Sequence, residues 1–89
     1  MYKRQLLEAS LGEEVEDEIL EIIRGVPGVK NPHNLRTRKI GNYVAIDIHI
    51  EVDGDMSVVE AHSIADAVEH RLKEVFGGAT HVSVHVEPH

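Results

Sequence analysis

The chain has 89 residues, of which 42% are hydrophobic, and it carries a formal net charge of -7 at pH 7. That length corresponds to one domain with a modest core. The acidic balance and the small number of aromatic residues, two tyrosines and one phenylalanine, argue against nucleic-acid binding, which needs a basic surface or stacking rings. Because the chain has no cysteine, disulfides, thiolate metal sites and thiol nucleophiles are excluded. No apolar run approaches the roughly 20 residues that span a bilayer, and no signal peptide is recognisable, so we expect a soluble chain.

A first helix is predicted near the N-terminus. Ser10 and Glu13 have the spacing of a capping box, which opens a helix, and Gly25 and Pro27 are typical of a helix end. The apolar residues between these signals follow helical spacing: Val15, Ile19, Ile22, Ile23 and Val26. Residues 1–9 are also compatible with a helix, and we interpret them as the end of a connection from a preceding segment.

Two strands and a tight turn follow. A short polar strand is predicted over 35–40, and the turn residues Gly41-Asn42 lead into a second strand over 43–52. The second strand alternates between two faces. Its apolar face consists of Val44, Ile46, Ile48, Ile50 and Val52, and its other face consists of Tyr43, Ala45, Asp47, His49 and Glu51.

A second helix and a last strand complete the chain. Ser57 and Glu60 form another capping box, and the helix is predicted to run to about Phe76, before Gly77-Gly78. Its core-facing residues are expected to be Val58, Ala61, Ile64, Ala65, Val68, Leu72 and Val75. The last strand has one face with Val82, Val84 and Val86, and one face with His81, Ser83, His85 and Glu87. The order helix, strand, strand, helix, strand predicts the α+β class.

Seven histidines in 89 residues are the main chemical signal. His49 lies on the polar face of a strand, and His85 and Glu87 share the polar face of another at a spacing that lets both reach one ion. His62 falls near the start of the second helix, and His33 in a loop that enters the first strand. Imidazole and carboxylate ligands suit zinc and other divalent transition metals. The spacing alone favours metal binding and simple solvation of these side chains equally, because the sequence does not show which strands are neighbours.

Other patterns have simpler explanations. A single histidine on an exposed face is usually solvated, and we interpret His70, His81 and His89 in this way. The sequence contains no glycine-rich phosphate loop. A small basic cluster either pairs with the acidic first helix or forms a contact surface; it consists of Arg36, Arg38 and Lys39.

Several short motifs occur in an order that is more specific than any one of them. They are Val26-Pro27-Gly28-Val29, His33-Asn34-Leu35-Arg36-Thr37-Arg38 with Gly41, the strand around His49, Glu60-Ala61-His62-Ser63-Ile64-Ala65-Asp66 and His85-Val86-Glu87-Pro88. Together they resemble the C-terminal cytoplasmic domain of cation diffusion facilitator transporters. The resemblance extends over about 13–88, which is nearly the whole chain.

The resemblance implies a metallochaperone-like two-layer sandwich with a three-stranded sheet, a homodimer, and regulation of the export of zinc or a similar divalent ion by proton exchange. The metal ligands of that family fall on His33, His49, His62, His85 and Glu87, where some members have aspartate in place of Glu87. We expect His49, His85 and Glu87 at the centre, with His33 and His62 completing one or two coordination spheres. Residues 1–9 would connect to a membrane domain, and 10–89 would form the metal-binding domain at the cytoplasmic face of the cell membrane. The domain alone would neither transport ions nor act as an enzyme.

Three other functions remain open from the sequence. A small-molecule-sensing α+β module with scattered surface histidines would show no change in melting temperature with zinc. A metal-dependent hydrolase fragment would need an open coordination position, a base and a substrate pocket, and the sequence offers no nucleophile-and-base pair. A soluble metal-delivery protein would present its ligands in one exposed loop, whereas these come from separate elements.

Overall fold

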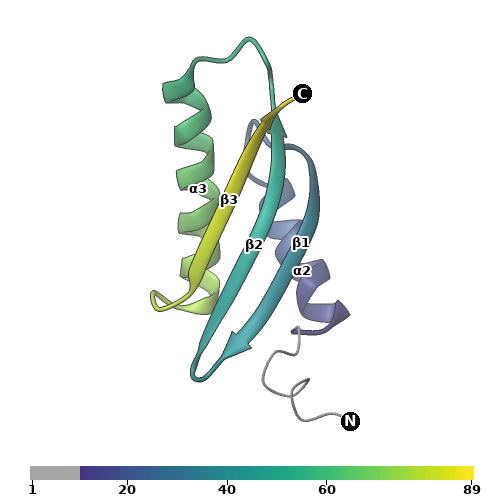
Figure 1. Ribbon diagram of the computed structural model, residues 1–89, viewed down its shortest axis with the longest axis vertical. Helices are drawn as coiled ribbons and strands as arrows, with labels where there is room; N and C mark the ends of the chain where they lie inside the picture. Colours follow the sequence, from purple (N-terminus) through teal and green to yellow (C-terminus); the bar gives the residue numbers. More distant parts are fainter. Residues whose placement is uncertain (1–10) are drawn as a thin grey trace.

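The computed structural model describes residues 11–89, and its elements follow the predicted order (Figure 1). They are α2 (Glu13–Arg24), β1 (Lys30–Ile40), β2 (Tyr43–Val52), α3 (Val58–Phe76) and β3 (His81–Pro88). The expected connection at 1–9 and Ser10 of the first predicted capping box lie outside the described residues. None of the described helices combines the length and the apolar composition that are needed to cross a bilayer.

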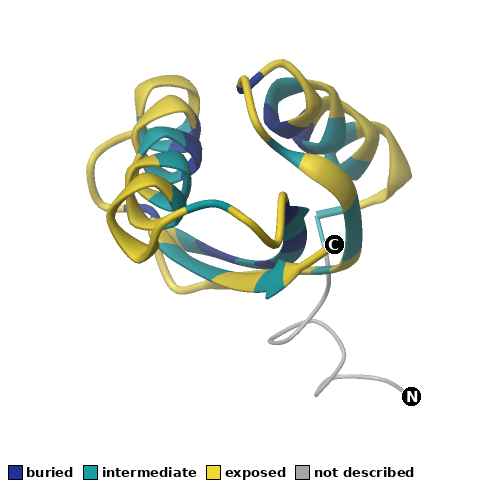
Figure 2. Ribbon diagram, turned by 90° about the horizontal axis from the view of Figure 1, so that it is seen from above, coloured by how far each residue is buried: buried dark blue, intermediate teal, exposed yellow. Residues whose placement is uncertain are grey.

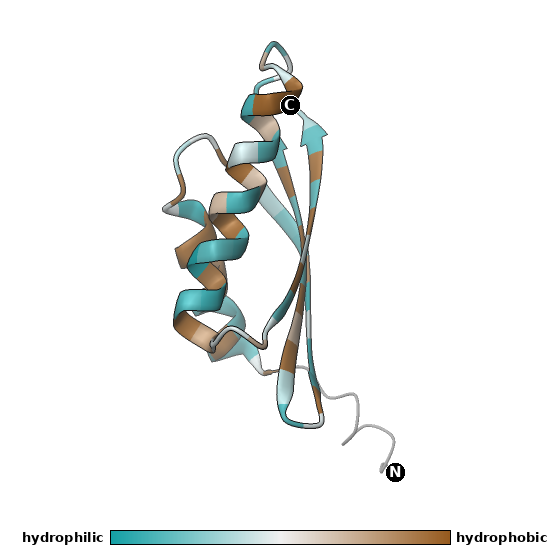
Figure 3. Ribbon diagram, turned by 90° about the vertical axis from the view of Figure 1, so that its left-hand side faces the viewer, coloured by the Kyte–Doolittle hydropathy of each residue, from teal (hydrophilic) through white to brown (hydrophobic). Residues whose placement is uncertain are grey.

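The three strands form one sheet in the order β1-β2-β3. β1 and β2 are antiparallel, whereas β2 and β3 are parallel. Parallel neighbours require a long crossover connection, and α3 provides it. Both helices lie on the same side of the sheet, as Figures 2 and 3 show, so the described residues form two layers and leave the other sheet face without a helix.

The core lies between the helices and the inner face of the sheet. Its buried residues are Ile19, Ile23, Val26, Ile46, Ile48, Ile50, Val52, Val68 and Leu72. This all-aliphatic core confirms the predicted alternation of β2 and the apolar side of α2. Three residues that were expected in the core are exposed: Val58, Val75 and Val86. They lie near the ends of α3 and on the edge strand β3, where fewer neighbours can cover a side chain.

The start of α2 differs from the prediction. Glu13 is the first helical residue, and the N-cap is Gly12, which has φ 98° and provides no side-chain cap. The predicted capping box is therefore wrong, because Glu13 does not occupy the third helical position that a box requires. A contact with β1 holds this end instead: Leu11 N donates to Thr37 Oγ1 (3.0 Å), and the same hydroxyl donates to Glu16 Oε2 (2.6 Å).

The start of α3 agrees with the prediction. The N–H of Glu60 donates to Ser57 Oγ, and the N–H of Ser57 donates to Glu60 Oε1, each at 3.1 Å, which completes the capping box. The loop before β1 packs closely against this helix. Gly28 has φ +94°, and a Cβ at this position would lie 2.5 Å from Ile64 Cδ1. The loop and α3 therefore need glycine here for both backbone conformation and space.

β1 is longer than predicted, because it begins at Lys30 and not at residue 35. Asn31 (φ 43°) and Asn34 (φ 54°) have left-handed conformations that usually mark turns. In this strand they coincide with shifts of register on both sides of His33 and do not end the strand. His33 therefore lies in a strand opposite His49, and its predicted place in a loop is wrong.

Candidate metal centre

A row of three histidines crosses the sheet face that bears no described helix. His33 pairs with His49 in the antiparallel register, and His49 pairs with His85 in the parallel register. Their ring centroids are 5.5 Å apart for the first pair and 4.5 Å apart for the second. The next register pair of β2 and β3 on the same sheet face is Glu51 and Glu87, so imidazoles and carboxylates adjoin.

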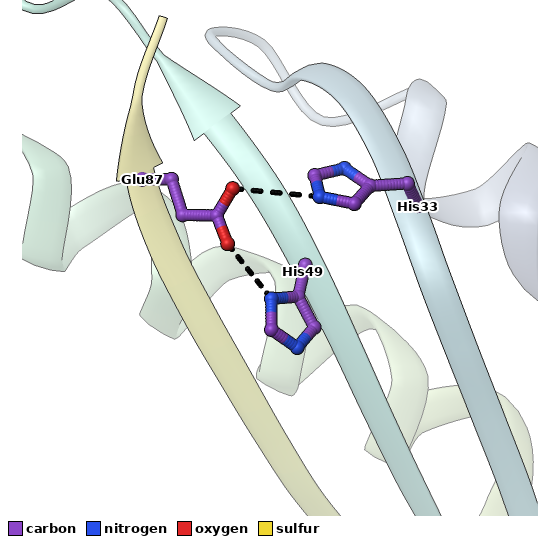
Figure 4. A group of neighbouring side chains, drawn as sticks. All are labelled: His33, His49 and Glu87. Carbon is purple, nitrogen blue, oxygen red and sulfur yellow. Dashed lines mark hydrogen bonds and ion pairs between the residues drawn. The ribbon is translucent and has the colours of Figure 1, made fainter.

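Three of these residues form a group whose possible ligand atoms all lie within 4.8 Å of one another: His33, His49 and Glu87 (Figure 4). The carboxylate contacts both rings. Its Oε2 is 2.8 Å from His49 Nδ1, and its Oε1 is 3.4 Å from His33 Nε2. Each of the three side chains is partly exposed, so an ion from solvent can reach the group.

The backbone fixes which nitrogen of His33 faces the group. His33 Nδ1 lies 2.8 Å from the carbonyl oxygen of Asn31, and a carbonyl only accepts, so Nδ1 carries a proton. In the neutral ring, the lone pair of Nε2 then faces the carboxylate of Glu87. Two acceptors in this position repel each other unless a proton or a cation lies between them. Asn31 is itself held by a hydrogen bond of 3.0 Å from its Nδ2 to Glu51 Oε2.

The two neighbouring rings lower the pKa of the Glu87 carboxyl from its ordinary value of 4.5. The hydrogen bond from His49 is the largest cause, and the charges of His33 and His49 act in the same direction. Partial withdrawal of the carboxyl from water acts in the opposite direction. Glu87 is therefore ionised at neutral pH, which is the form that ligates a metal.

His85 lies beside this group and not in it. Its ring stacks on His49 with an interplanar angle of 14°, and its Nε2 lies 2.9 Å from Asp47 Oδ1. The carboxylate favours a proton on Nε2 and leaves Nδ1 as the proton-free nitrogen of the neutral ring. Asp47 is absent from the ligands that the sequence predicts; its position two residues before His49 on the same strand face was the available signal.

His62 is the one predicted ligand that does not share this sheet face. It lies on α3, its side chain is 76% exposed, and its Nε2 is 3.5 Å from Asp66 Oδ2. α3 packs on the other side of the sheet (Figure 3). Within one chain, four of the five predicted residues therefore lie on one sheet face, and His62 lies apart from them on α3.

Residues 11–89 match the family described as "Cation efflux protein, cytoplasmic domain". The chain belongs to this family. Membership confirms the resemblance to cation diffusion facilitator transporters. It also confirms that this cation efflux domain is not an enzyme, because its relatives are efflux transport proteins.

A curated relative of the cation efflux domain is the cation-efflux pump FieF of Escherichia coli (strain K12 / DH10B). It is 38% identical over 85 residues, which are 96% of this chain and 28% of FieF. The chain thus spans little more than a quarter of the length of the curated relatives that it matches first.

Solved structures resemble the cation efflux domain over most of its length. The metal-bound C-terminal domain of the CzcD transporter from Thermotoga maritima is 31% identical, with a TM-score of 0.75, and the match covers 99% of this chain and 94% of that one. The zinc form of CzrB is 34% identical (TM-score 0.74; 89% and 90% covered). A nickel form of a MamM CTD is 29% identical (TM-score 0.79; 88% and 99% covered). These likenesses confirm the predicted α+β fold with a three-stranded sheet.

Proposed function

We propose that this domain binds divalent transition-metal ions, zinc first among them, and that the bound ion regulates efflux by a transporter of which the domain is part. The observation that carries the proposal is the group of His33, His49 and Glu87 with its ligand atoms within 4.8 Å. The donor set of two imidazoles and one carboxylate suits zinc and similar ions, and not magnesium or calcium, which prefer oxygen.

His33, His49 and Glu87 would hold a first ion. A cation relieves the unfavourable approach of the His33 Nε2 lone pair to the carboxylate, which is 3.4 Å away. His85 lies next to His49 with its Nδ1 available, so it would contribute to a second ion that shares Glu87. The metal-bound CzcD domain and the zinc form of CzrB support the proposal, because they are metal-bound domains of similar sequence.

His62 would join a site only across a contact between two chains. In one chain it lies on the helix side of the sheet, away from the row of histidines. This separation supports a homodimer, in which His62 of one copy meets the sheet face of another. A small domain also gains stability from a partner.

Metal would act as a signal by changing the balance between two arrangements of this dimer. The carboxylates of Asp47, Glu51 and Glu87 share one sheet face and repel one another without a cation. An ion that ties β1, β2 and β3 favours the arrangement in which its ligands meet, by its difference in affinity for the two states. The segment before α2 would carry the change to a membrane domain, with this domain at the cytoplasmic face of the cell membrane.

Calorimetry with zinc, mass by light scattering and small-angle X-ray scattering test the proposal together. We expect zinc binding, a dimer mass at micromolar concentration, and a more compact dimer with zinc than with a chelator. The His49→Ala variant is the control, because it should keep the fold and lose the compaction. A monomer mass with and without zinc would contradict the dimer, zinc binding without compaction would contradict sensing, and an absence of zinc binding would favour a small-molecule-sensing module.

A further inference from the structure

The exposed side of α3 carries histidines and carboxylates in alternation at every fourth position. This α3 stripe consists of His62, Asp66, His70 and Glu74, all exposed. Residues four apart on a helix lie on the same side, one turn from each other. Only His62 among them corresponds to a ligand of the sheet site as proposed above, so the other three are unassigned.

His70 is the residue of the stripe with a carboxylate on both sides. Its Nε2 lies 3.3 Å from Glu74 Oε2, one turn later, and Asp66 lies one turn earlier. Asp66 and His70 also line one shallow surface hollow of about 280 Å³, together with Glu69 and Lys73. The charge of Lys73 is taken up by Glu69, whose Oε2 is 3.0 Å from its Nζ. The remaining donors of the hollow are the imidazole of His70 and the carboxylate of Asp66, and Asp66 Oδ2 lies 3.5 Å from His62 Nε2.

We propose that His70 and Glu74 form an auxiliary site for divalent transition-metal ions on the surface of α3. The helix holds the imidazole and the carboxylate of Glu74 3.3 Å apart, so little further ordering is needed for both to ligate one ion. The neutral ring moves its proton to Nδ1 when Nε2 binds the metal. The imidazole selects ions such as zinc, nickel and cobalt over magnesium and calcium.

The auxiliary site is weaker than the sheet site and independent of it. It offers two protein donors on an exposed surface, and water completes the coordination. It shares no residue with the group of His33, His49 and Glu87, and α3 lies on the other side of the sheet from that group. It therefore fills at higher cation concentration, and it does not depend on the proposed function of the sheet site.

Paramagnetic nickel is a suitable probe, because Ni²⁺ broadens the amide signals of residues near the bound ion. In the His49→Ala variant of the whole 89-residue chain, we expect Ni²⁺ to broaden signals centred on residues 66–74 of α3. Adding His70→Ala should abolish this localised broadening, and Glu74→Gln should weaken it while keeping a hydrogen-bond partner for His70. The matched control is His81→Ala, an exposed histidine with no carboxylate within 4 Å among the described residues.

Two results would overturn the proposal. Broadening of α3 that survives His70→Ala would assign the ion to other residues, and broadening centred on His62 alone would leave His70 without a role. His70 is exposed and makes no core contact, so its replacement should leave the circular dichroism spectrum unchanged. A failure of zinc to bind the sheet group would leave this result unaffected, because the test variant already lacks His49.

Discussion

His49 and His85 are register partners in the parallel β2-β3 pair, and their rings stack 4.5 Å apart at an angle of 14°. The two rings nevertheless have different partners. His49 donates to Glu87, whereas His85 donates to Asp47. Two neighbouring imidazoles of one row thus differ in what they can contribute to metal binding.

We expect His49→Ala to weaken zinc binding more than His85→Ala does. His49 belongs to the group of three and also contacts its carboxylate, whereas His85 lies outside the group. Calorimetry and elemental analysis of the loaded protein would give the affinity and the number of ions per chain. His49→Ala should lose the first ion, and His85→Ala should keep it while losing a second. Zinc binding unchanged by His85→Ala would remove this residue from the ligands.

Replacing Asp47 with asparagine should weaken binding of the second ion about tenfold, which is the usual scale for a residue that orients a metal-binding histidine. Asp47 accepts a hydrogen bond of 2.9 Å from His85 Nε2 and so favours the tautomer with Nδ1 free. Nitrogen chemical shifts of the imidazole would report the tautomer directly. Ser83→Ala is the control, because Ser83 is the register partner of Asp47 in β3. An unchanged tautomer in Asp47→Asn would contradict this role.

The stability that Glu87 gives to the metal-free domain should be lost in acid. Its pKa in the folded state is lowered from 4.5, so its contribution to the free energy of unfolding is present above that value and is lost as the pH falls through the folded-state pKa. The difference in unfolding free energy between the parent chain and Glu87→Gln should therefore shrink below about pH 4.5. Urea denaturation in the presence of a chelator measures it, with the exposed Glu14→Gln as the control for loss of a charge. A difference that grows in acid would contradict a lowered pKa of Glu87 in the folded state.

Zinc should raise the melting temperature strongly at neutral pH and little at about pH 5. One ion at 100 times its dissociation constant stabilises the native state by about 2.7 kcal/mol, and each kcal/mol corresponds to roughly 4–8 °C for a domain of this size. Imidazole ligates only when it is neutral, and its reference pKa is about 6.5. Calorimetric melting at both pH values measures the gain. Equal gains would mean that histidines are not the ligands.

Gly28→Ala should destabilise the fold by about 1–3 kcal/mol, the usual cost of a residue held in a strained backbone conformation. The new Cβ would lie 2.5 Å from Ile64 Cδ1, and the backbone has φ +94°. Gly78→Ala is a matched control, because nothing lies within 4 Å of a Cβ there. Urea denaturation gives both values. Zinc affinity should stay the same, since Gly28 packs against α3 and not on the histidine face; a large loss of affinity would show that this loop supports the site.

The fold follows from the sequence where local patterns agree. The alternation of β2 and the capping box at Ser57 predict their elements correctly, because both signals depend only on near neighbours. The start of β1 was missed, since Asn31 and Asn34 resemble turn residues, and only pairing with β2 shows that they form irregularities within a strand.

The sequence predicts a set of candidate ligands but not their geometry. The sequence places His49, His85 and Glu87 on polar strand faces, and the structure agrees. His33, and not His85, belongs to the group of three because of the register shifts around His33. No rule of sequence spacing predicts such shifts. The contact of His33 Nδ1 with the Asn31 carbonyl is likewise a property of the folded backbone.

The parallel pairing of β2 and β3 has a consequence for folding rates. Glu87 meets His49, 38 positions earlier in the chain, only after α3 has crossed the sheet and β3 has docked as an edge strand. Contacts between such distant positions form late, because the intervening chain must first be ordered. A partly folded chain therefore lacks the complete group of His33, His49 and Glu87. An ion that binds the complete group stabilises the native state more than the transition state for folding. Metal should consequently lengthen the lifetime of the folded domain and leave the rate at which it folds nearly unchanged.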